Sequence, residues 1–263
     1  MIIRTGFTML VLLVLTVVLG TMVLAAQLLG IPHGDGSIYH RAPQWWARAL
    51  LWCAGTRVVV HGDPSQAAGP GRVYMSNHVS WFDILAMVDI LPYYGFVAKR
   101  EIEKVPVFGP AARTVGVIYI DRENRKAAFN AYEDAAQRIR DGQSVIVYPE
   151  GTRGDTYSLR PFKKGPFVLA IQSGVPIIPV AMYGTIEVNR RGSLMVFPGT
   201  VHVHLLDAVP TEGLTYDDRD RLAMKVRSMI AGTLRDNYGV PDLGAAKPLS
   251  TPSSTVQQHH VPA

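Results

Sequence analysis

The sequence predicts an α/β fold, a mostly parallel sheet flanked by helices, preceded by a hydrophobic membrane segment at the N-terminus. Between residues 56 and 238, short β-branched runs bounded by Gly, Pro or Asp alternate with amphipathic helical patterns. Strands that alternate with helices form parallel sheets. Hydrophobic residues make up 48% of the 263 and charged residues 18%, which excludes a mainly disordered or fibrous protein. No internal repeat or linker interrupts the region, so one domain is expected.

The first predicted element is the apolar N-terminal segment. Residues 6–32 carry no charge, and a helix of about 20 apolar residues can cross a bilayer. A cleaved signal peptide is the competing interpretation, since Arg4 precedes the segment and small residues occupy 23–26. The apolar stretch is longer than the usual 7 to 15 residues or so of such peptides, so we predict a membrane anchor over residues 1–32. Gly20 leaves open two shorter interfacial helices in place of one span.

The next elements follow from local patterns. Pro43 is expected to open an apolar helix that contains three tryptophans and ends at Gly55. Strands are predicted at 56–60, 73–76, 116–120, 144–148, 177–182 and 201–206, and helices at 124–141, 164–173 and 216–238. Residues 241–263 lack an apolar period and are predicted to form a disordered tail, which leaves 33–240 as the folded domain.

Charge and side-chain chemistry limit the function. Lys and Arg exceed Asp and Glu by 26 to 21, a net charge of +5 that suits an anionic membrane surface and is too weak to indicate nucleic acid. The single cysteine, Cys53, excludes an internal disulfide and a thiolate metal cluster. His61, His202 and His204 lie at strand-like positions without clear ligand spacing, so we expect structural roles and no metal site.

The first chemical motif is Ser-Asn-His-Val-Ser-Trp-Phe-Asp at 76–83, directly after a predicted strand. On one regular helix, side chains five positions apart point about 140° apart, so His78 can meet Asp83 only if His78 lies in the turn and Asp83 on the next helix. The carboxylate would then fix one imidazole tautomer, and the other nitrogen could accept a proton from a hydroxyl. Ser80 is a weaker candidate nucleophile, because no nucleophile elbow surrounds it. Simple capping by His78 and Asp83 remains open at this stage.

The second motif, Val-Tyr-Pro-Glu-Gly-Thr-Arg-Gly at 147–154, also follows an apolar strand. Arginine suits bidentate binding of phosphate, and a glycine turn at Gly151 can expose backbone amides to the same anion. This loop therefore predicts an anion site that contains Arg153.

Together, the Asn-His-x4-Asp and Pro-Glu-Gly-Thr-Arg motifs resemble those of the glycerolipid acyltransferases, specifically the 1-acyl-glycerol-3-phosphate acyltransferase family. Two further blocks agree: Lys-Arg-Glu-Ile at 99–102 with Ile-Asp-Arg at 120–122, and Val-Pro-Ile-Ile-Pro-Val at 175–180. The blocks occur in family order over residues 77–180. Tyr148, Ile102 and Gly154 depart from the common phenylalanine, leucine and serine, and only Gly154 would alter contacts to the acceptor.

The resemblance implies a role for each matching residue. His78 would be the general base and Asp83 its orienting partner. The implied substrate-binding residues are Asn77, Lys99, Glu101, Arg122, Glu150, Gly151, Thr152 and Arg153.

The resemblance also implies the reaction. A fatty acyl group would move from an acyl thioester, acyl-CoA or acyl carrier protein, to the sn-2 hydroxyl of lysophosphatidic acid and give phosphatidic acid. The thioester is a co-substrate, no cofactor or metal is expected, and backbone amides would stabilise the oxyanion. The alternatives are another lyso-lipid acceptor, such as a lyso-ornithine lipid or another lysophospholipid, and a non-catalytic lipid-binding protein of the same fold. The expected location is the cell membrane, with the site on the cytoplasmic side and no nucleic-acid partner.

Overall fold

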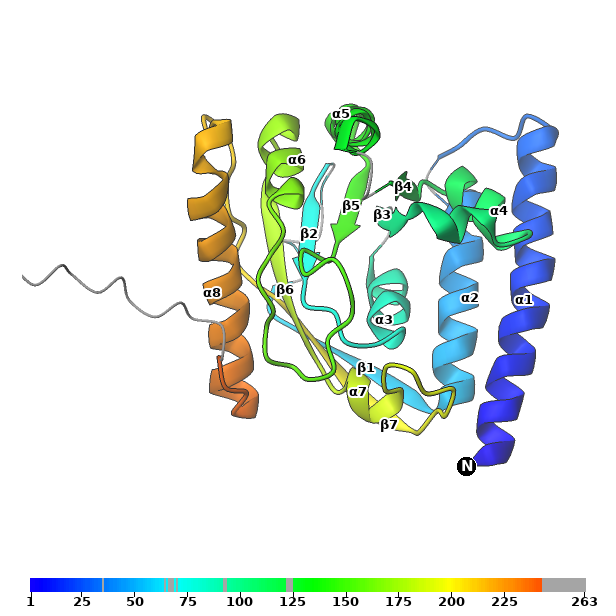
Figure 1. The fold of residues 1–263 in the computed structure, drawn as a ribbon. Helices are drawn as coiled ribbons and strands as arrows, with labels where there is room; N and C mark the ends of the chain where they lie inside the picture. The colour runs from blue at the N-terminus through cyan, green and yellow to red at the C-terminus, as the bar shows by residue number, and fades with distance from the viewer. Residues whose placement is uncertain are drawn as a thin grey trace, which may run out of the picture.

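The centre of the molecule is a mixed, mostly parallel sheet. The computed structural model describes residues 1–34, 36–63, 65, 69, 71–91, 94–121 and 125–242. Within them the sheet has seven strands in the order β1-β7-β6-β2-β5-β3-β4 (Figure 1). The strands are β1 (Thr56–His61), β2 (Val73–Ser76), β3 (Tyr94–Lys99), β4 (Ile118–Ile120), β5 (Ser144–Val147), β6 (Ile177–Tyr183) and β7 (Gly199–Leu205). The pairing of β6 with β7 is antiparallel, and the other neighbouring pairs are parallel. The predicted fold class is confirmed.

Helices cover both faces of the sheet. The helices are α1 (Ile2–Leu28), α2 (Ile38–Ala54), α3 (Phe82–Ile90), α4 (Phe108–Thr114), α5 (Arg125–Arg140), α6 (Gly165–Ser173), α7 (Thr185–Val188) and α8 (Arg219–Tyr238). Side chains of α2 and α3 share one apolar cluster with alternate residues of β2, β5 and β6. The other alternate residues of these strands pack with α5, α6 and α8. The central strands β2 and β5 are buried throughout, as expected for strands covered on both faces.

The apolar N-terminal segment forms one continuous helix. α1 runs beside α2 at the edge of the molecule (Figure 1), and Trp46 Nε1 donates a hydrogen bond of 3.0 Å to Thr16 Oγ1 between them. The helix does not break at Gly20. A Cβ added there would lie 2.7 Å from Val107 Cγ1, so glycine serves close packing against the residue that precedes α4. Arg4 donates from Nη1 to Ala54 O at 3.1 Å and so satisfies a carbonyl at the C-terminal end of α2.

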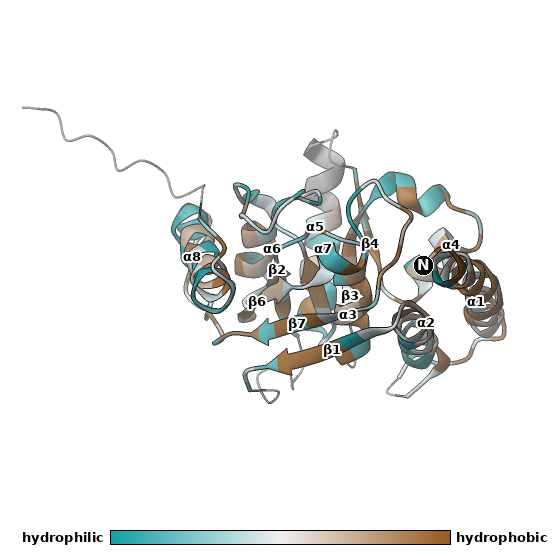
Figure 2. Ribbon diagram, turned by 90° about the horizontal axis from the view of Figure 1, so that it is seen from below, coloured by the Kyte–Doolittle hydropathy of each residue, from teal (hydrophilic) through white to brown (hydrophobic). Residues whose placement is uncertain are grey.

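The outer face of α1 is apolar along its length. Large exposed side chains include Phe7, Leu10, Leu13 and Val17, and the helix is strongly hydrophobic in Figure 2. By length and composition, α1 is the one helix of the described residues that could cross a membrane.

The structure differs from the sequence predictions at α2 and β3. α2 begins at Ile38 and not at Pro43, because Tyr39 and Ala42 pack against α1 and extend the helix toward its N-terminus. β3 was not predicted at all. The predicted tail, apart from Pro241 and Asp242, lies outside the described residues.

Candidate active site

The two chemical motifs meet at one edge of the sheet. β2 and β5 are parallel neighbours, with Met75 opposite Val147, so the loops that follow them leave the sheet side by side. The first loop leads from Ser76 into α3, and the second begins at Tyr148. Ligand sites of α/β sheets form at this carboxyl edge, where loops stand on a rigid frame.

His78 and Asp83 are in direct contact. Asp83 is fully buried in the first turn of α3, and its Oδ2 lies 2.8 Å from His78 Nδ1. The same oxygen accepts backbone hydrogen bonds from Val79 at 2.6 Å and Ser80 at 2.8 Å. A carboxylate in this position accepts a proton held on Nδ1, which leaves Nε2 as the unprotonated nitrogen. The structure therefore brings the two side chains together as their spacing required: His78 in the turn and Asp83 on the helix.

Buried polar side chains hold the His78 loop in place. Asn77 donates to Met182 O at 2.9 Å and accepts from Met182 N at 2.8 Å, which ties the loop to β6. Ser80 donates its hydroxyl proton to Asn189 O at 2.7 Å. Both side chains are fully buried. Asn77 was predicted to contact substrate, but its amide oxygen and nitrogen are both bonded to Met182, so it holds the loop in place. Ser80 is likewise a structural residue.

Glu150 joins the two loops. Its Oε1 accepts from the backbone amide of His78 at 2.9 Å, and its Oε2 accepts from the amide of Arg160 at 3.2 Å. The amide of Gly154 donates to His78 O at 2.7 Å in the reverse direction. Glu150 is buried, and burial raises its pKa to about 7, although the two backbone hydrogen bonds act to lower it. Glu150, which was predicted to bind substrate, thus positions the backbone of His78.

The raised pKa of Glu150 predicts a pH-dependent stability. Since the folded protein binds this proton more tightly than the unfolded chain, the contribution of Glu150 to the free energy of unfolding should fall as pH rises from 4.5 to about 7. The full difference is on the order of 3 kcal/mol, at about 1.4 kcal/mol per pKa unit. Denaturant unfolding in detergent should show this slope in the wild type and lose it in Glu150→Gln. An equal slope in the two proteins would assign the effect to other groups.

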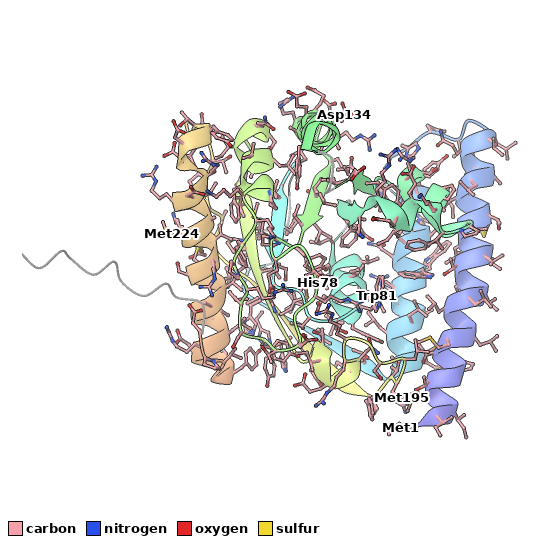
Figure 3. The ribbon with its side chains drawn as sticks, viewed as in Figure 1. Met1, His78, Trp81, Asp134, Met195 and Met224 are labelled. Atoms are coloured by element: carbon pink, nitrogen blue, oxygen red, sulfur yellow. The ribbon has the colours of Figure 1, made fainter. Side chains whose placement is uncertain are left out.

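Arg153 reaches across to the first loop. Its guanidinium carbon lies 4.7 Å from the ring centroid of Trp81, whose side chain is 50% exposed. Burial, together with the nearby charge of Arg191, lowers the pKa of Arg153, but a guanidinium remains charged at neutral pH. Figure 3 labels His78 and Trp81 in the same part of the molecule, beside α3. A fixed cation therefore stands beside the loop that carries the imidazole.

Trp81 and Tyr148 are site residues that the sequence did not single out. The ring of Tyr148 stacks on that of His78, with centroids 4.0 Å apart and planes inclined by 17°. Its hydroxyl is buried without a hydrogen-bond partner among the described residues, and burial raises its pKa well above the ordinary value. Tyr148 stood out only as a departure from the family's phenylalanine, and Trp81 only as an aromatic residue inside the first motif.

The other predicted residues that the structure describes are on β3, on the 3₁₀ helix after it and in the second loop. Lys99 ends β3, and its Nζ lies 2.7 Å from Glu101 Oε1 in the short 3₁₀ helix that follows, with both side chains about half exposed. Gly151 turns with a φ of +77°, a conformation that favours glycine, and Thr152 is exposed. Arg122 lies outside the described residues. Lys99 and Glu101 thus form a pair with each other next to the site.

The histidines on β1 and β7 also come together, which their spacing did not reveal. His61 Nε2 lies 2.9 Å from His202 Nδ1, and His204 Nε2 lies 2.6 Å from the hydroxyl of Tyr238. In the described part of the chain, no group of three or more His, Cys, Asp or Glu side chains has an arrangement that could hold a metal ion.

Comparison with known proteins defines the class. The family described as Acyltransferase matches residues 57–183, which include both loops. Human 1-acyl-sn-glycerol-3-phosphate acyltransferase alpha is 37% identical over 189 residues, 71% of this chain and 67% of the relative. A putative enzyme of that name, acl-2 of Caenorhabditis elegans, is 35% identical over 193 residues, 71% and 68% of the two chains. The chain belongs to the 1-acyl-sn-glycerol-3-phosphate acyltransferase family and is an acyltransferase.

A solved structure has the same fold. The 1-acyl-sn-glycerophosphate (LPA) acyltransferase PlsC of Thermotoga maritima aligns with a TM-score of 0.76 at 22% identity, over 89% of this chain and 95% of its own. The family resemblance of the motifs is confirmed, and the chain spans about two thirds of the human and nematode relatives.

Proposed function

We propose that this enzyme transfers a fatty acyl group from an acyl thioester to the sn-2 hydroxyl of lysophosphatidic acid and releases phosphatidic acid. The observation that carries the proposal is the His78–Asp83 pair beside the Arg153 cation at one edge of the sheet. The names of the relatives support lysophosphatidic acid as the acceptor. The donor is an acyl-CoA or an acyl carrier protein, and it is consumed in each turnover.

In the proposed reaction, His78 acts as a general base. The pKa of an alcohol is far above that of imidazole, so Nε2 takes the hydroxyl proton while the oxygen attacks the thioester carbonyl. Asp83 stabilises the imidazolium that forms. Backbone amides stabilise the oxyanion. When the tetrahedral intermediate collapses, the C–S bond breaks and the thiolate takes the proton from His78.

Arg153 binds the phosphate of the acceptor in this proposal. Its stacking on Trp81 limits the positions of the guanidinium, so less side-chain freedom is lost when the phosphate binds. Thr152 lies in the same turn, is exposed and would contribute its hydroxyl, whereas the amide of Gly151 already donates to Tyr148 O at 3.0 Å and so holds the turn. Lys99 lies at the adjacent strand end and would add long-range attraction for the anion.

We further propose that α1 holds the enzyme at the cell membrane, with the site on the cytoplasmic side. Acceptor and product both carry long acyl chains that prefer a bilayer, and the exposed side chains of α1 are apolar along its length. This placement lets the acceptor reach His78 without leaving the lipid phase.

Asp83→Asn should lower kcat while the protein stays folded. The asparagine oxygen can accept the backbone hydrogen bonds of Val79 and Ser80, but a neutral amide no longer stabilises an imidazolium. We expect a loss of about tenfold to a hundredfold, no larger than the effect of removing His78, with little change in the KM of either substrate. Steady-state kinetics with both substrates varied measure this. Full activity in Asp83→Asn would contradict the role of the pair.

A panel of acceptors tests the proposed substrate. The purified enzyme is offered lysophosphatidic acid, a lyso-ornithine lipid and other lysophospholipids, with acyl-CoA and acyl carrier protein donors in parallel. The proposal expects the largest kcat/KM with lysophosphatidic acid. A preference for an acceptor without phosphate, such as a lyso-ornithine lipid, would contradict it, because Arg153 would then have no phosphate to bind.

A further inference from the structure

A second pocket lies at the opposite edge of the sheet from the candidate active site. It has a volume of about 410 Å³ and is lined in part by Gly116, which precedes β4, and Gln143, which precedes β5. These positions are at the amino ends of strands whose carboxyl ends carry the catalytic loops. Figure 3 shows the separation, since Asp134 on α5 labels this edge and His78 lies well away from it. The pocket is therefore separate from the acyl-transfer site.

The charge of this pocket favours an anion. Arg113 at the end of α4 and Arg138 on α5 both line it, and none of its lining residues is a carboxylate. Arg113 pairs with Glu103, which is outside the lining. Arg138 is exposed and makes no ion pair within the described part of the chain. A guanidinium without a carboxylate partner is a ready donor to a phosphate group.

The walls of the pocket are ordered by their own contacts. The rings of His33 and Tyr39 stack with centroids 3.7 Å apart, and His33 Nε2 lies 3.1 Å from Gln27 Oε1. Tyr39 is buried and donates its hydroxyl proton to Ile31 O at 2.9 Å. On the opposite wall, a Cβ at Gly116 would lie 2.1 Å from Gln143 Nε2, so these two residues are closely packed. The cavity is thus formed before a ligand arrives.

The rim of the pocket is apolar where it meets α1. Gln27, a lining residue, is followed by Leu28 and Leu29, which are 88% and 79% exposed, and Ile31 is also exposed. These side chains continue the row of exposed apolar side chains of α1 to its C-terminal end. A ligand that fits both surfaces has an anionic head and an apolar tail. A free phosphate would leave the apolar rim uncovered.

We propose that this pocket binds the anionic head group of a membrane phospholipid, with the acyl chains of the lipid lying along the exposed end of α1. Arg138 is the main contact for the phosphate, and Arg113 adds a second positive charge. The site would fix the depth and tilt of the enzyme at the membrane surface, at the end of α1 far from Met1. The proposal rests on the membrane contact of α1 and not on the catalytic role of His78.

The test is a binding titration of the full chain in neutral detergent. The probe is a short-chain phosphatidylglycerol, with phosphatidylcholine of the same chain length and inorganic phosphate as comparisons. Arg153→Ala is used as the background for every variant, so that binding at the catalytic edge is weakened throughout. Arg138→Gln removes one of the two positive charges that line the pocket. Lys225→Gln removes a charge from the exposed face of α8 on the far side of the molecule (Figure 1).

Phosphatidylglycerol should bind with one-to-one stoichiometry, and Arg138→Gln should weaken this binding about tenfold while Lys225→Gln leaves it unchanged. Equal affinity in the two variants would overturn the site. Phosphate binding as tight as the lipid would overturn the lipid as its ligand, and so would equal binding of phosphatidylcholine. Both substitutions are at exposed helical positions that accept glutamine, and equal unfolding temperatures would confirm that both variants are folded. Failure of His78→Ala to affect acyl transfer would leave this result untouched, so the two proposals can fail separately.

Discussion

His78→Ala is expected to reduce kcat for acyl transfer by at least about a hundredfold. The substitution removes the only imidazole in contact with Asp83 within the described residues, and the acceptor hydroxyl then loses its proposed proton acceptor. Since His78 is partly exposed and its backbone amide is held by Glu150, the loop should keep its conformation. Initial rates with saturating thioester and lysophosphatidic acid measure the loss.

The control for this prediction is a histidine outside the site. His61→Ala changes a partly buried histidine on the edge strand β1, outside both proposed sites, and should leave kcat unchanged. Turnover of His78→Ala at the wild-type rate, in a protein with an unaltered unfolding temperature, would remove the general-base role.

Arg153→Ala is expected to raise the KM for lysophosphatidic acid by about tenfold or more, with a smaller effect on kcat. A hydrogen bond between two charged groups contributes about 1.5 to 3 kcal/mol, and the phosphate is bound equally in the ground state and the transition state. Trp81→Leu should raise the same KM only a few-fold, because an exposed cation–π contact is worth about 0.5 to 1 kcal/mol. Kinetics with the acceptor varied at saturating donor distinguish the two variants.

The control is Lys225→Ala, which removes a positive charge from the outer face of α8. The KM of this variant for lysophosphatidic acid should stay at the wild-type value. If Arg153→Ala and Lys225→Ala behaved alike, the phosphate of the acceptor would be bound elsewhere.

Local chemistry made the centre of the site predictable. The contact between His78 and Asp83 involves residues of one motif, and their spacing allows it only in a turn followed by a helix, which the structure contains. The meeting of the two loops followed from the parallel order of strands, since both motifs come directly after strands that proved to be neighbours. The first inference needed no long-range contact, and the second needed only the pairing of β2 with β5.

Tertiary contacts explain what the sequence did not reveal. β3 has a single β-branched residue, Val97, and contains Gly95, where a Cβ would lie 2.3 Å from Gly116 O. The close approach of the two backbones requires glycine at position 95. A glycine there also weakens the β-branched pattern from which a strand is predicted. The stacking of Arg153 on Trp81 joins residues of separate motifs, so no local period could indicate it. The same holds for Asn77, whose partner Met182 is 105 positions away.

The proposed reaction requires one site that combines a base for the hydroxyl with a cation for the phosphate. The most direct test compares kcat/KM for lysophosphatidic acid and for the monoacylglycerol of the same chain, which has a free hydroxyl and no phosphate, in the wild type, Arg153→Ala and His78→Ala. We predict that Arg153→Ala lowers kcat/KM for lysophosphatidic acid alone, whereas His78→Ala lowers it for both acceptors. An equal loss for both acceptors in Arg153→Ala would contradict the account.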